Sequence, residues 1–582
     1  MGYKENYNAW LNDKYFDEKT RAELAALGDD DREIEERFFK SLEFGTGGLR
    51  GVMGAGTNRM NIYTVRIATQ GLANYILLSA QNGAVRGVAI AYDSRRLSRE
   101  FAEEAAHVLN GNGIKSYIFD DLRPTPMLSF AIRHLGCAAG IVVTASHNPP
   151  EYNGYKAYWE DGAQIPYPRD GEIIQEVNKI TEFTQIRYMA RGEAEDAGLF
   201  NIIPKKVDDA FTENVKAQTV NAELIARMAD RVNIVYTPIN GSGNRPVRRV
   251  LAELGYKNVH VVPEQENPDP DFTTVGYPNP EDVNVFKLAI ELAKKVEADV
   301  IIGTDPDCDR VGALIKSADG EYAVMTGNMT GALLEEYILT QRRALGALPQ
   351  NPAVVSTIVS TRLAREIAEE NGVAYYDVLT GFKYIGEKIK QFEQSGEHSF
   401  VFGFEESYGC LSGTYARDKD AVVATMLICE LVAFFKQNGL TLYDGLQELY
   451  RKYGYYKESV QSITLKGIEG LQSIGRVMAN LRAKPPKAIG MKKTAVTADY
   501  LARVKTTLGP DGTAAEEPIT LPAADVLHYT LADGSWACVR PSGTEPKLKI
   551  YFGVRADTRE RANAALAKLT KAAMALVDGA MK

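Results

Sequence analysis

The chain of 582 residues is 45% hydrophobic and 25% charged, which is the composition of an ordinary globular protein. Its net charge of −9 argues against a general nucleic-acid-binding or membrane-surface protein, and no apolar run approaches the roughly 20 residues that span a bilayer. The length is too great for one hydrophobic core and predicts roughly four domains.

The N-terminal residues and the cysteines indicate the cellular compartment in which the protein works. The five cysteines are dispersed and form no C-x-x-C pair, so we expect reduced thiols and not a disulfide framework. The first residues lack the apolar segment of a signal peptide, and Asn6 stands where a myristoylation site prefers Ser or Thr. These features predict a cytoplasmic protein.

The first part of the chain is predicted to be a helical extension followed by an α/β unit. Residues 1–42 are polar and helix-prone, a glycine-dense loop is predicted over 44–51, and a helix is predicted over about 64–80. From residue 87, apolar runs of strand length alternate with segments of helical periodicity. The predicted strands are 88–92, 114–119 and 138–144, with helices at 98–110 and 125–134.

The same alternation recurs twice, which is typical of βαβ units with right-handed crossovers and a largely parallel sheet. The second block has predicted strands at 233–236, 259–262 and 299–303 and helices at 246–254 and 285–296. The third has strands at 353–358, 374–377 and 399–404 and helices at 361–371 and 384–394. The recurrence indicates an internal structural repeat, although the sequences of the blocks are not visibly alike.

The pattern changes after about residue 450. Strands are predicted at 460–465, 526–531, 536–539 and 549–554, helices at 468–481 and 558–577, and a Pro/Gly/Thr-rich connection at 484–522. The predicted fold is therefore three tandem mixed α/β domains plus a C-terminal α+β domain. Their expected boundaries are 1–42 for the helical extension, then 43–205, 206–322, 323–452 and 453–582.

A serine follows the strand predicted over 138–144. Pro149 and Pro150 come shortly after Ser146 and His147, and they forbid ordinary helix or strand continuation because each fixes φ and lacks an N–H. We expect a rigid, exposed turn that presents the Ser146 hydroxyl. Taken alone, the Ser-His pair is more typical of a polar exit from a strand than of a catalytic site.

Three carboxylates follow the strand of the second block. Asp305, Asp307 and Asp309 occupy alternating positions and so share one side of an extended segment. Three anions this close need a cation, and hard oxygen ligands suit Mg²⁺. An EF-hand is excluded because Arg310 and Lys316 stand where its glycine and bidentate glutamate belong. A solvated acidic turn is the alternative, which the flanking buried strand disfavours.

Two further loops offer ligand chemistry. Glu405 and Ser407 follow the strand of the third block, and their carboxylate and hydroxyl suit the vicinal diols of a sugar. Between two strands of the last domain, Arg540 to Pro546 combines a guanidinium, two hydroxyls and glycine-exposed amides, which can surround a phosphate dianion. Each loop is also compatible with an ordinary surface turn, as are the polar segments 380–383 and 417–420.

Location links these motifs. Ligands of open α/β sheets bind beyond the carboxyl ends of the strands. Such ends are occupied by Ser146, by the loop that carries Asp305, Asp307 and Asp309 (the aspartate loop), and by Glu405, one in each βαβ block. This common position favours a single shared site over three unrelated turns.

The combination of motifs resembles the α-D-phosphohexomutase superfamily. It comprises T-A-S-H-N-P at 144–149, D-P-D-x-D-R at 305–310, G-F-E-E-S-Y-G at 403–409 and R-P-S-G-T at 540–544, and the resemblance runs from Phe44 into the C-terminal domain. Segments 56–61 and 267–272 look most like bacterial α-phosphoglucomutases and eukaryotic phosphopentomutases. The resemblance implies a heart-shaped fold in which a TBP-like C-terminal domain completes a central cleft.

The resemblance also implies roles for individual residues. Ser146 is expected to carry a phosphoryl group, and Asp305, Asp307, Asp309 and a phosphoserine oxygen are expected to bind Mg²⁺. Charged or proton-transferring positions around the phosphoryl group are Arg50, His147, Lys156 and Arg310, of which Lys156 is the candidate general acid/base. Expected substrate contacts are Thr380, Gly381, Glu405, Ser407 and Lys419 for the sugar phosphate, and Arg540, Ser542, Gly543 and Thr544 for the non-reacting phosphate.

The implied activity is that of an Mg²⁺-dependent phosphoglucomutase that interconverts glucose 1-phosphate and glucose 6-phosphate through glucose 1,6-bisphosphate. Phosphopentomutase and phosphomannomutase are the alternatives, and Tyr408-Gly409-Cys410 lacks a histidine that some dual glucose/mannose enzymes carry there. Two alternatives belong to a functional class other than the mutases. One is a phosphatase with Ser146 as nucleophile, and the other is a non-catalytic sugar-phosphate sensor. We expect small sugar phosphates as partners, a monomer or homodimer, and a lowered pKa at Lys156.

Overall fold

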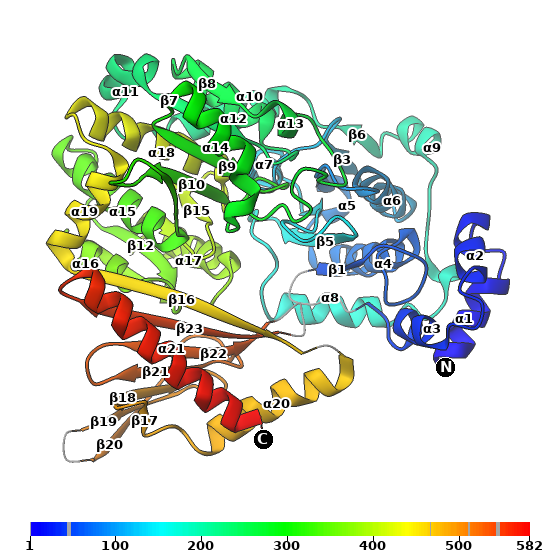
Figure 1. Cartoon of the computed structure of the whole chain (residues 1–582). Helices are drawn as coiled ribbons and strands as arrows, with labels where there is room; N and C mark the ends of the chain where they lie inside the picture. The colour runs from blue at the N-terminus through cyan, green and yellow to red at the C-terminus, as the bar shows by residue number, and fades with distance from the viewer. Residues whose placement is uncertain (1, 43–47, 466, 510–511, 543–546, 582) are drawn as a thin grey trace.

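The computed structural model describes residues 2–42, 48–465, 467–509, 512–542 and 547–581. Three α/β units follow one another through most of the chain, and an antiparallel C-terminal unit lies below them in Figure 1. The N-terminal helices form a separate layer at the edge of the first unit (Figure 1). The predicted fold class is thereby confirmed.

The N-terminal extension is helical, as its sequence predicts. It contains α1 (Tyr3–Asn12), α2 (Glu18–Ala25) and α3 (Asp31–Phe38), and the side chains of Asp17 and Asp30 cap the last two helices. Buried aromatic rings hold the layer together, with the centroids of Trp10 and Phe16 4.2 Å apart and Tyr63 of α4 packed against both.

The first sheet has the order β1-β5-β4-β2-β3-β6. Its strands are β1 (Gly48–Val52), β2 (Val88–Tyr92), β3 (Ser116–Ile118), β4 (Ala139–Val143), β5 (Tyr152–Trp159) and β6 (Phe200–Ile202). The last four in this order are parallel, whereas β5 and β1 run antiparallel to their neighbours. Helices α4 (Ile62–Ser79), α5 (Gly83–Arg86), α6 (Ser98–Gly111), α7 (Thr125–Leu135), α8 (Arg169–Asn178) and α9 (Arg191–Asp196) accompany it.

The prediction of a loop over 44–51 is wrong for Gly48 to Gly51, which belong to β1. Residues 44–47 lie outside the described residues. Gly48 pairs with Lys156 and a Cβ at Gly48 would lie 2.1 Å from the carbonyl oxygen of Tyr155, so the glycine serves close strand approach and not a turn.

The second and third sheets repeat the plan of the first. The second, β11-β10-β9-β7-β8, contains β7 (Asn233–Thr237), β8 (Asn258–Val261), β9 (Val300–Thr304), β10 (Val311–Lys316) and β11 (Tyr322–Met325). The third, β13-β12-β14-β15, contains β12 (Pro352–Thr357), β13 (Ala374–Val378), β14 (Ser399–Phe404) and β15 (Cys410–Ser412).

In each of the three sheets, a parallel strand turns back into an antiparallel partner: β4 into β5, β9 into β10, and β14 into β15. The sheets are therefore mixed, and the expectation of largely parallel sheets fails at these hairpins. No strand is predicted from the sequence at β5, β10 or β15.

The helices of the second and third units surround these sheets. They are α10 (Lys206–Lys216), α11 (Ala222–Met228), α12 (Asn244–Glu253), α13 (Pro263–Glu266), α14 (Lys287–Val296), α15 (Gly327–Ala344), α16 (Leu363–Glu370), α17 (Phe382–Ser395), α18 (Ala421–Gln437) and α19 (Leu442–Tyr453). No single helix among the described residues has the length and hydropathy of a membrane span; α18 and α19 meet that test only as a pair bent by 86°.

The C-terminal unit is an antiparallel sheet of order β16-β23-β22-β21-β18-β19-β20, with β17 paired to β18. Its elements are β16 (Tyr455–Thr464), α20 (Gly467–Ala483), β17 (Ala488–Ile489), β18 (Lys492–Asp499), β19 (Val504–Leu508), β20 (Ala514–Pro518), β21 (Leu527–Leu531), β22 (Trp536–Pro541), β23 (Lys547–Ala556) and α21 (Arg559–Met581). The stretch predicted as a connection over 484–522 thus contains four strands. The edge strand β20 is exposed throughout, so it carries no apolar alternation that would reveal it.

One hydrophobic core runs through the three α/β units. It extends from β2 and α7 through α12 and α15 to α18 and α19, and α18 is buried along almost its whole length. The C-terminal unit has a core of its own between its sheet and α20 and α21. A smaller cluster, including Ile358, Leu379, Trp536 and Tyr551, joins the third unit to the C-terminal unit.

Candidate active site

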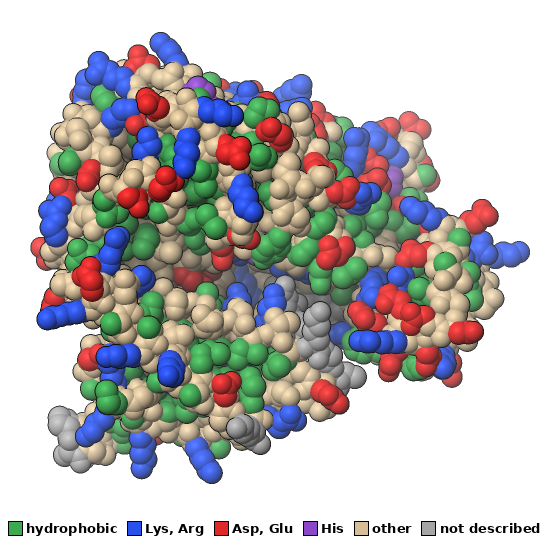
Figure 2. Space-filling model, in the orientation of Figure 1, with side chains coloured by type: hydrophobic (Ala, Val, Ile, Leu, Met, Phe, Trp, Pro, Cys, Tyr) green, Lys and Arg blue, Asp and Glu red, His purple; other side chains and the backbone are tan. Residues whose placement is uncertain are grey.

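The hairpin loops of the first two units meet at Ser146. Figure 2 shows a hollow between the α/β units and the C-terminal unit, with basic and acidic side chains gathered in it. The Ser146 hydroxyl donates a 2.9 Å hydrogen bond to Oδ2 of Asp305, and its backbone has a φ of 51°. Ser146 is only 4% exposed, so the expectation of an exposed hydroxyl is wrong: the second unit covers the turn.

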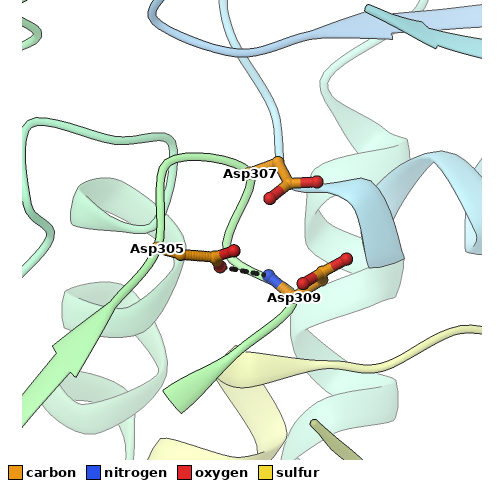
Figure 3. A group of neighbouring side chains, drawn as sticks. All are labelled: Asp305, Asp307 and Asp309. Carbon is orange, nitrogen blue, oxygen red and sulfur yellow. Dashed lines mark hydrogen bonds between the residues drawn. The ribbon is translucent and has the colours of Figure 1, made fainter. Parts of the chain in front are cut away.

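The aspartate loop lies between β9 and β10 (Figure 3). It is a turn and not an extended segment, because the N–H of Cys308 donates to the carbonyl of Asp305 and Cys308 has a φ of 51°. The turn nevertheless brings the three carboxylates together, with one oxygen from each within 4.8 Å of the others.

Each of these carboxylates is held by the protein through one oxygen. Oδ1 of Asp305 accepts the N–H groups of Asp309 and Arg310, at 3.0 Å each. Oδ2 of Asp307 accepts from Lys156 at 2.9 Å, and Oδ2 of Asp309 lies 3.1 Å from Nζ of Lys419.

The second oxygens of Asp307 and Asp309 are left for another ligand. The buried Oδ1 atoms of Asp307 and Asp309 have no hydrogen-bond partner among the described residues, and Oδ2 of Asp305 bonds to the Ser146 hydroxyl. Burial and the charges of Asp307 and Asp309 raise the pKa of Asp305 well above its usual value. Three buried, inward oxygens that repel one another fit a small divalent cation of the Mg²⁺ type.

Lys156 reaches this loop from β5. Its Nζ lies 2.9 Å from Asp307 and 3.6 Å from Asp309. Burial alone lowers the pKa of the Lys156 ammonium, but the two carboxylates outweigh it and the pKa is raised. The expectation of a lowered pKa is therefore wrong, because the nearest charges are anions.

Lys419 belongs to a buried chain of charged groups. Its Nζ lies 3.0 Å from Asp418, whose other oxygen accepts a 2.6 Å hydrogen bond from the Tyr158 hydroxyl. Burial lowers the pKa of Lys419, but Asp309 and Asp418 raise it by more than burial lowers it. The pKa of Lys419 is therefore raised overall. Segment 417–420 is thus interior and not an ordinary surface loop.

His147 lies beside the serine, with Nδ1 3.2 Å from the Ser146 hydroxyl oxygen. Burial, Arg310 and Arg50 hold the pKa of His147 well below its usual range, so the ring is neutral at physiological pH. Arg310 is tied by a 3.0 Å contact to Glu281, and Arg50 lies on β1 opposite Gly154 of β5.

The loop between β14 and β15 brings Glu405 to the segment after β13. Oε1 of Glu405 accepts the N–H of Gly381 at 2.9 Å, and the Thr380 hydroxyl is buried with no hydrogen-bond partner among the described residues. Burial raises the pKa of Glu405 to about 7. Ser407 is half-buried in the same loop.

The predicted phosphate loop is only partly described. Arg540 is the last residue but one of β22, and the N–H of Ser542 donates to the carbonyl of Lys547 at 2.7 Å, whereas Gly543 and Thr544 lie outside the described residues. Lys549 on β23 pairs with Arg540, and burial lowers the pKa of its ammonium.

Sequence reasoning missed several residues at the site. They are Arg95, Thr125, Glu281, Asp418 and Lys549. Arg95 could have been found, because it follows the carboxyl end of β2, the same kind of position that drew attention to Ser146. The others depend on contacts between distant segments.

Comparisons with known proteins cover the whole arrangement. Family models described as phosphoglucomutase/phosphomannomutase match alpha/beta/alpha domain I at residues 41–184, domain II at 209–319, domain III at 326–453 and the C-terminal domain at 492–570. A phosphoglucomutase of Staphylococcus haemolyticus (strain JCSC1435) is 36% identical over 529 residues, which covers 90% of this chain and 93% of the relative.

Solved structures share the fold. The parafusin (phosphoglucomutase) of Paramecium, in its open form, aligns with a TM-score of 0.67 at 17% identity and covers 92% of this chain and 95% of its own. The N-acetylphosphoglucosamine mutase of Aspergillus fumigatus, in complex with GlcNAc-6P and magnesium, aligns with a TM-score of 0.50 at 13% identity, covering 92% and 96%.

The fold and these matches define an isomerase of the mutase class. The chain belongs to the phosphoglucomutase/phosphomannomutase family, within the α-D-phosphohexomutase superfamily.

Proposed function

We propose that this enzyme interconverts α-D-glucose 1-phosphate and glucose 6-phosphate by way of a phosphoserine at Ser146 and a glucose 1,6-bisphosphate intermediate. The observation that carries the proposal is the 2.9 Å contact between the Ser146 hydroxyl and Asp305, beside two buried carboxylate oxygens that accept no hydrogen bond from the described residues. The identity to a curated phosphoglucomutase supports glucose as the sugar.

A divalent cation, most simply Mg²⁺, fits the three inward oxygens of Asp305, Asp307 and Asp309, with a phosphoserine oxygen as a further ligand. When bound, such a cation neutralises charge on the phosphoryl group. The fungal mutase of similar fold was solved with magnesium, which is consistent with this assignment.

The phosphoryl transfer is a displacement in which each bond formed is matched by a bond broken. The free hydroxyl of the sugar phosphate attacks phosphorus, the bond from phosphorus to Ser146 Oγ breaks, and the hydroxyl proton passes to a base. After the bisphosphate reorients, Ser146 Oγ attacks the other phosphate and the sugar oxygen leaves with a proton. We assign the proton transfers to Lys156, and electrostatic support of the phosphoryl group to Arg50 and Arg310.

Because its pKa is raised, Lys156 can act as a base only under a condition. With Asp307 and Asp309 beside it, the ammonium is protonated and is a proton donor. It becomes a base only when those carboxylates are neutralised from another side. We assign to His147, which is neutral, the positioning of the Ser146 hydroxyl and not the role of base.

We infer that the substrate is held from two sides. Glu405, Ser407, Thr380, Gly381 and Lys419 face the sugar, and Arg540, Ser542, Gly543 and Thr544 hold the phosphate that is not reacting. Because the first group lies on the third unit and the second on the C-terminal unit, one phosphate can be gripped while the other is transferred.

The test is ³¹P NMR of the full-length protein with glucose, mannose and ribose 1-phosphates at matched concentrations, with Mg²⁺ and a trace of sugar bisphosphate. We expect isomerisation, to the 6-phosphate of a hexose or the 5-phosphate of ribose, to be fastest with glucose 1-phosphate and to vanish in Ser146→Ala. Undiminished conversion by Ser146→Ala would overturn the phosphoserine mechanism. Release of inorganic phosphate without isomerisation would make the enzyme a phosphatase, and faster conversion of mannose or ribose would reassign the substrate.

A further inference from the structure

The guanidinium of Arg95 lies inside the Ser146 hairpin loop and is completely buried. Its Nη2 donates to the carbonyl oxygens of Ser146, at 2.6 Å, and of Asn148. Its Nη1 donates to those of Pro149, at 2.8 Å, and Tyr152, at 3.1 Å. One side chain therefore ties together the whole connection between β4 and β5.

A second path leads from Arg95 to the N–H side of Ser146. Oδ2 of Asp93 lies 3.4 Å from Nε of Arg95 and accepts a 2.6 Å hydrogen bond from the Thr144 hydroxyl. The oxygen of that hydroxyl accepts the Ser146 N–H at 2.8 Å. The peptide groups on both sides of the Ser146 Cα are thus fixed by the same ion pair.

This arrangement matters because the backbone of Ser146 is left-handed, with a φ of 51°. Residues other than glycine rarely adopt that conformation, and it persists only where the surroundings over-determine it. In this conformation the hydroxyl points at Asp305. Relaxation of the loop would turn Oγ away from the aspartate loop.

Arg95, Asp93 and Thr144 together form a clamp around the Ser146 loop, and the second α/β unit packs against it. The ring of Phe272, which is fully buried, lies 5.0 Å from the guanidinium carbon of Arg95. Its neighbour Asp271 forms an ion pair with Arg96. The clamp therefore lies where the unit that carries Ser146 contacts the unit that carries the aspartates.

We propose that Arg95 is a positioning residue that holds the Ser146 backbone in the conformation that aims the hydroxyl at the aspartate loop. The proposal rests on the proposed function of Ser146 as phosphoryl carrier. Arg95 contacts no group assigned to the substrate, so its loss should lower kcat and leave KM nearly unchanged.

The main test variant is Arg95→Lys, which keeps the charge but cannot reach four carbonyl oxygens with one nitrogen. The matched control is Arg99→Lys, four residues away on α6, where an exposed side chain pairs with Glu103. We would measure kcat and KM for glucose 1-phosphate, hydrogen exchange of the amides in 145–152, and thermal unfolding of each full-length protein.

For Arg95→Lys we expect kcat to fall about 100-fold, because small misplacements of a reacting group have effects of this size. KM should stay within about threefold, and loop exchange should rise about tenfold or more. Arg99→Lys should match the wild type. A wild-type kcat in Arg95→Lys, or faster exchange with no loss of kcat, would overturn the proposal, as would a KM effect in place of a kcat effect.

If Arg95→Lys does not fold, Phe272→Leu tests the proposal that the clamp positions Ser146. It keeps the clamp but removes the ring beneath it, so faster loop exchange with a lower kcat would support the proposal, and wild-type values of both would overturn it. If the wild-type protein isomerised no sugar phosphate, the proposed function would fail, while loop exchange would still decide whether Arg95 holds the turn.

Discussion

The hydroxyl of Thr125 donates a 2.9 Å hydrogen bond to Oδ2 of Asp307, although 182 residues separate them in the chain. The N–H of Thr125 also donates to the carbonyl of Asp307 at 2.9 Å. The first residue of α7, in the first α/β unit, therefore orients a carboxylate of the second unit. Lys156 holds the same oxygen, which leaves Oδ1 directed inward.

Thr125→Val should lower the affinity for Mg²⁺ about 10- to 100-fold, the usual effect of losing an outer hydrogen bond to a metal ligand. At saturating Mg²⁺, kcat should return to nearly the wild-type value. The measurement is activity against free Mg²⁺ concentration. Thr212→Val is the control, because Thr212 is equally buried but its hydroxyl bonds only to a carbonyl of its own helix. Equal Mg²⁺ dependence in the two variants would contradict the assignment.

Lys156→Gln should lower kcat by about 10²- to 10⁴-fold, the range for loss of a general acid/base. Lys156→Arg keeps the charge beside Asp307 and Asp309 but transfers protons poorly, so it should keep Mg²⁺ affinity near the wild-type value and recover little of kcat. Single-turnover transfer from phosphorylated Ser146 to glucose 1-phosphate separates the two effects. Full recovery of kcat by arginine would mean that Lys156 acts only by its charge.

Glu405 should make the free energy of unfolding depend on pH. Burial raises its pKa to about 7, above the ordinary value of 4.5 that the unfolded chain retains. Between these values the folded protein keeps a proton that the unfolded chain releases, so the contribution to stability is full below pH 4.5 and is lost as the pH rises through 7.

Relative to Glu405→Gln, the wild type should therefore lose on the order of 3 kcal/mol between pH 4.5 and pH 8. Urea unfolding of both proteins, without Mg²⁺ or substrate, measures this difference. A difference between the two proteins that stays constant over the range would show that Glu405 titrates normally.

Gly327→Ala should disturb the loop between β14 and β15, which carries Glu405. A Cβ at Gly327 would lie 2.2 Å from the carbonyl oxygen of Glu406 and 2.6 Å from the N–H of Tyr408, and both atoms are backbone. We expect a loss of about 1–3 kcal/mol in unfolding free energy and a raised KM for glucose 1-phosphate.

Gly475→Ala in α20 is the matched control for that substitution, because a Cβ there meets nothing within 4 Å. It should stabilise the protein by about 0.5–1 kcal/mol and leave KM unchanged. An unaltered KM in Gly327→Ala would show that the Glu405 loop tolerates displacement.

Much of the site could be predicted from sequence because its loops follow strands that are short, apolar and bounded by turns. β2 is predicted with its observed bounds, 88–92, and β4, β9 and β14 are each predicted to within one residue. Their carboxyl ends then place Ser146, Asp305 and Glu405 at one edge of each sheet. The preceding strand is a local signal, so no knowledge of the partner segments is needed.

The rest depends on contacts that no local pattern encodes. β5 carries Lys156, but its buried residues follow no simple alternation, and the edge strand β20 of the C-terminal unit is exposed. The expected fall in the pKa of Lys156 assumed burial or neighbouring cations, because a base must act near neutral pH, whereas the neighbour is the anion Asp307, 151 residues away in the chain. The position of Arg95 after β2 is a local signal, but its role is not, because its partners are backbone carbonyls, which carry no sequence signature.

The continuous core of the three α/β units limits how this chain can be divided. A cut between them would expose apolar faces on both fragments, because β2, α12 and α18 belong to one packed cluster. The C-terminal unit closes around its own core and begins next to Gly454, whose φ is 95°. We therefore expect the three α/β units to unfold in one cooperative step and residues 455–582, which contact them through the smaller cluster at Trp536 and Tyr551, in a second step.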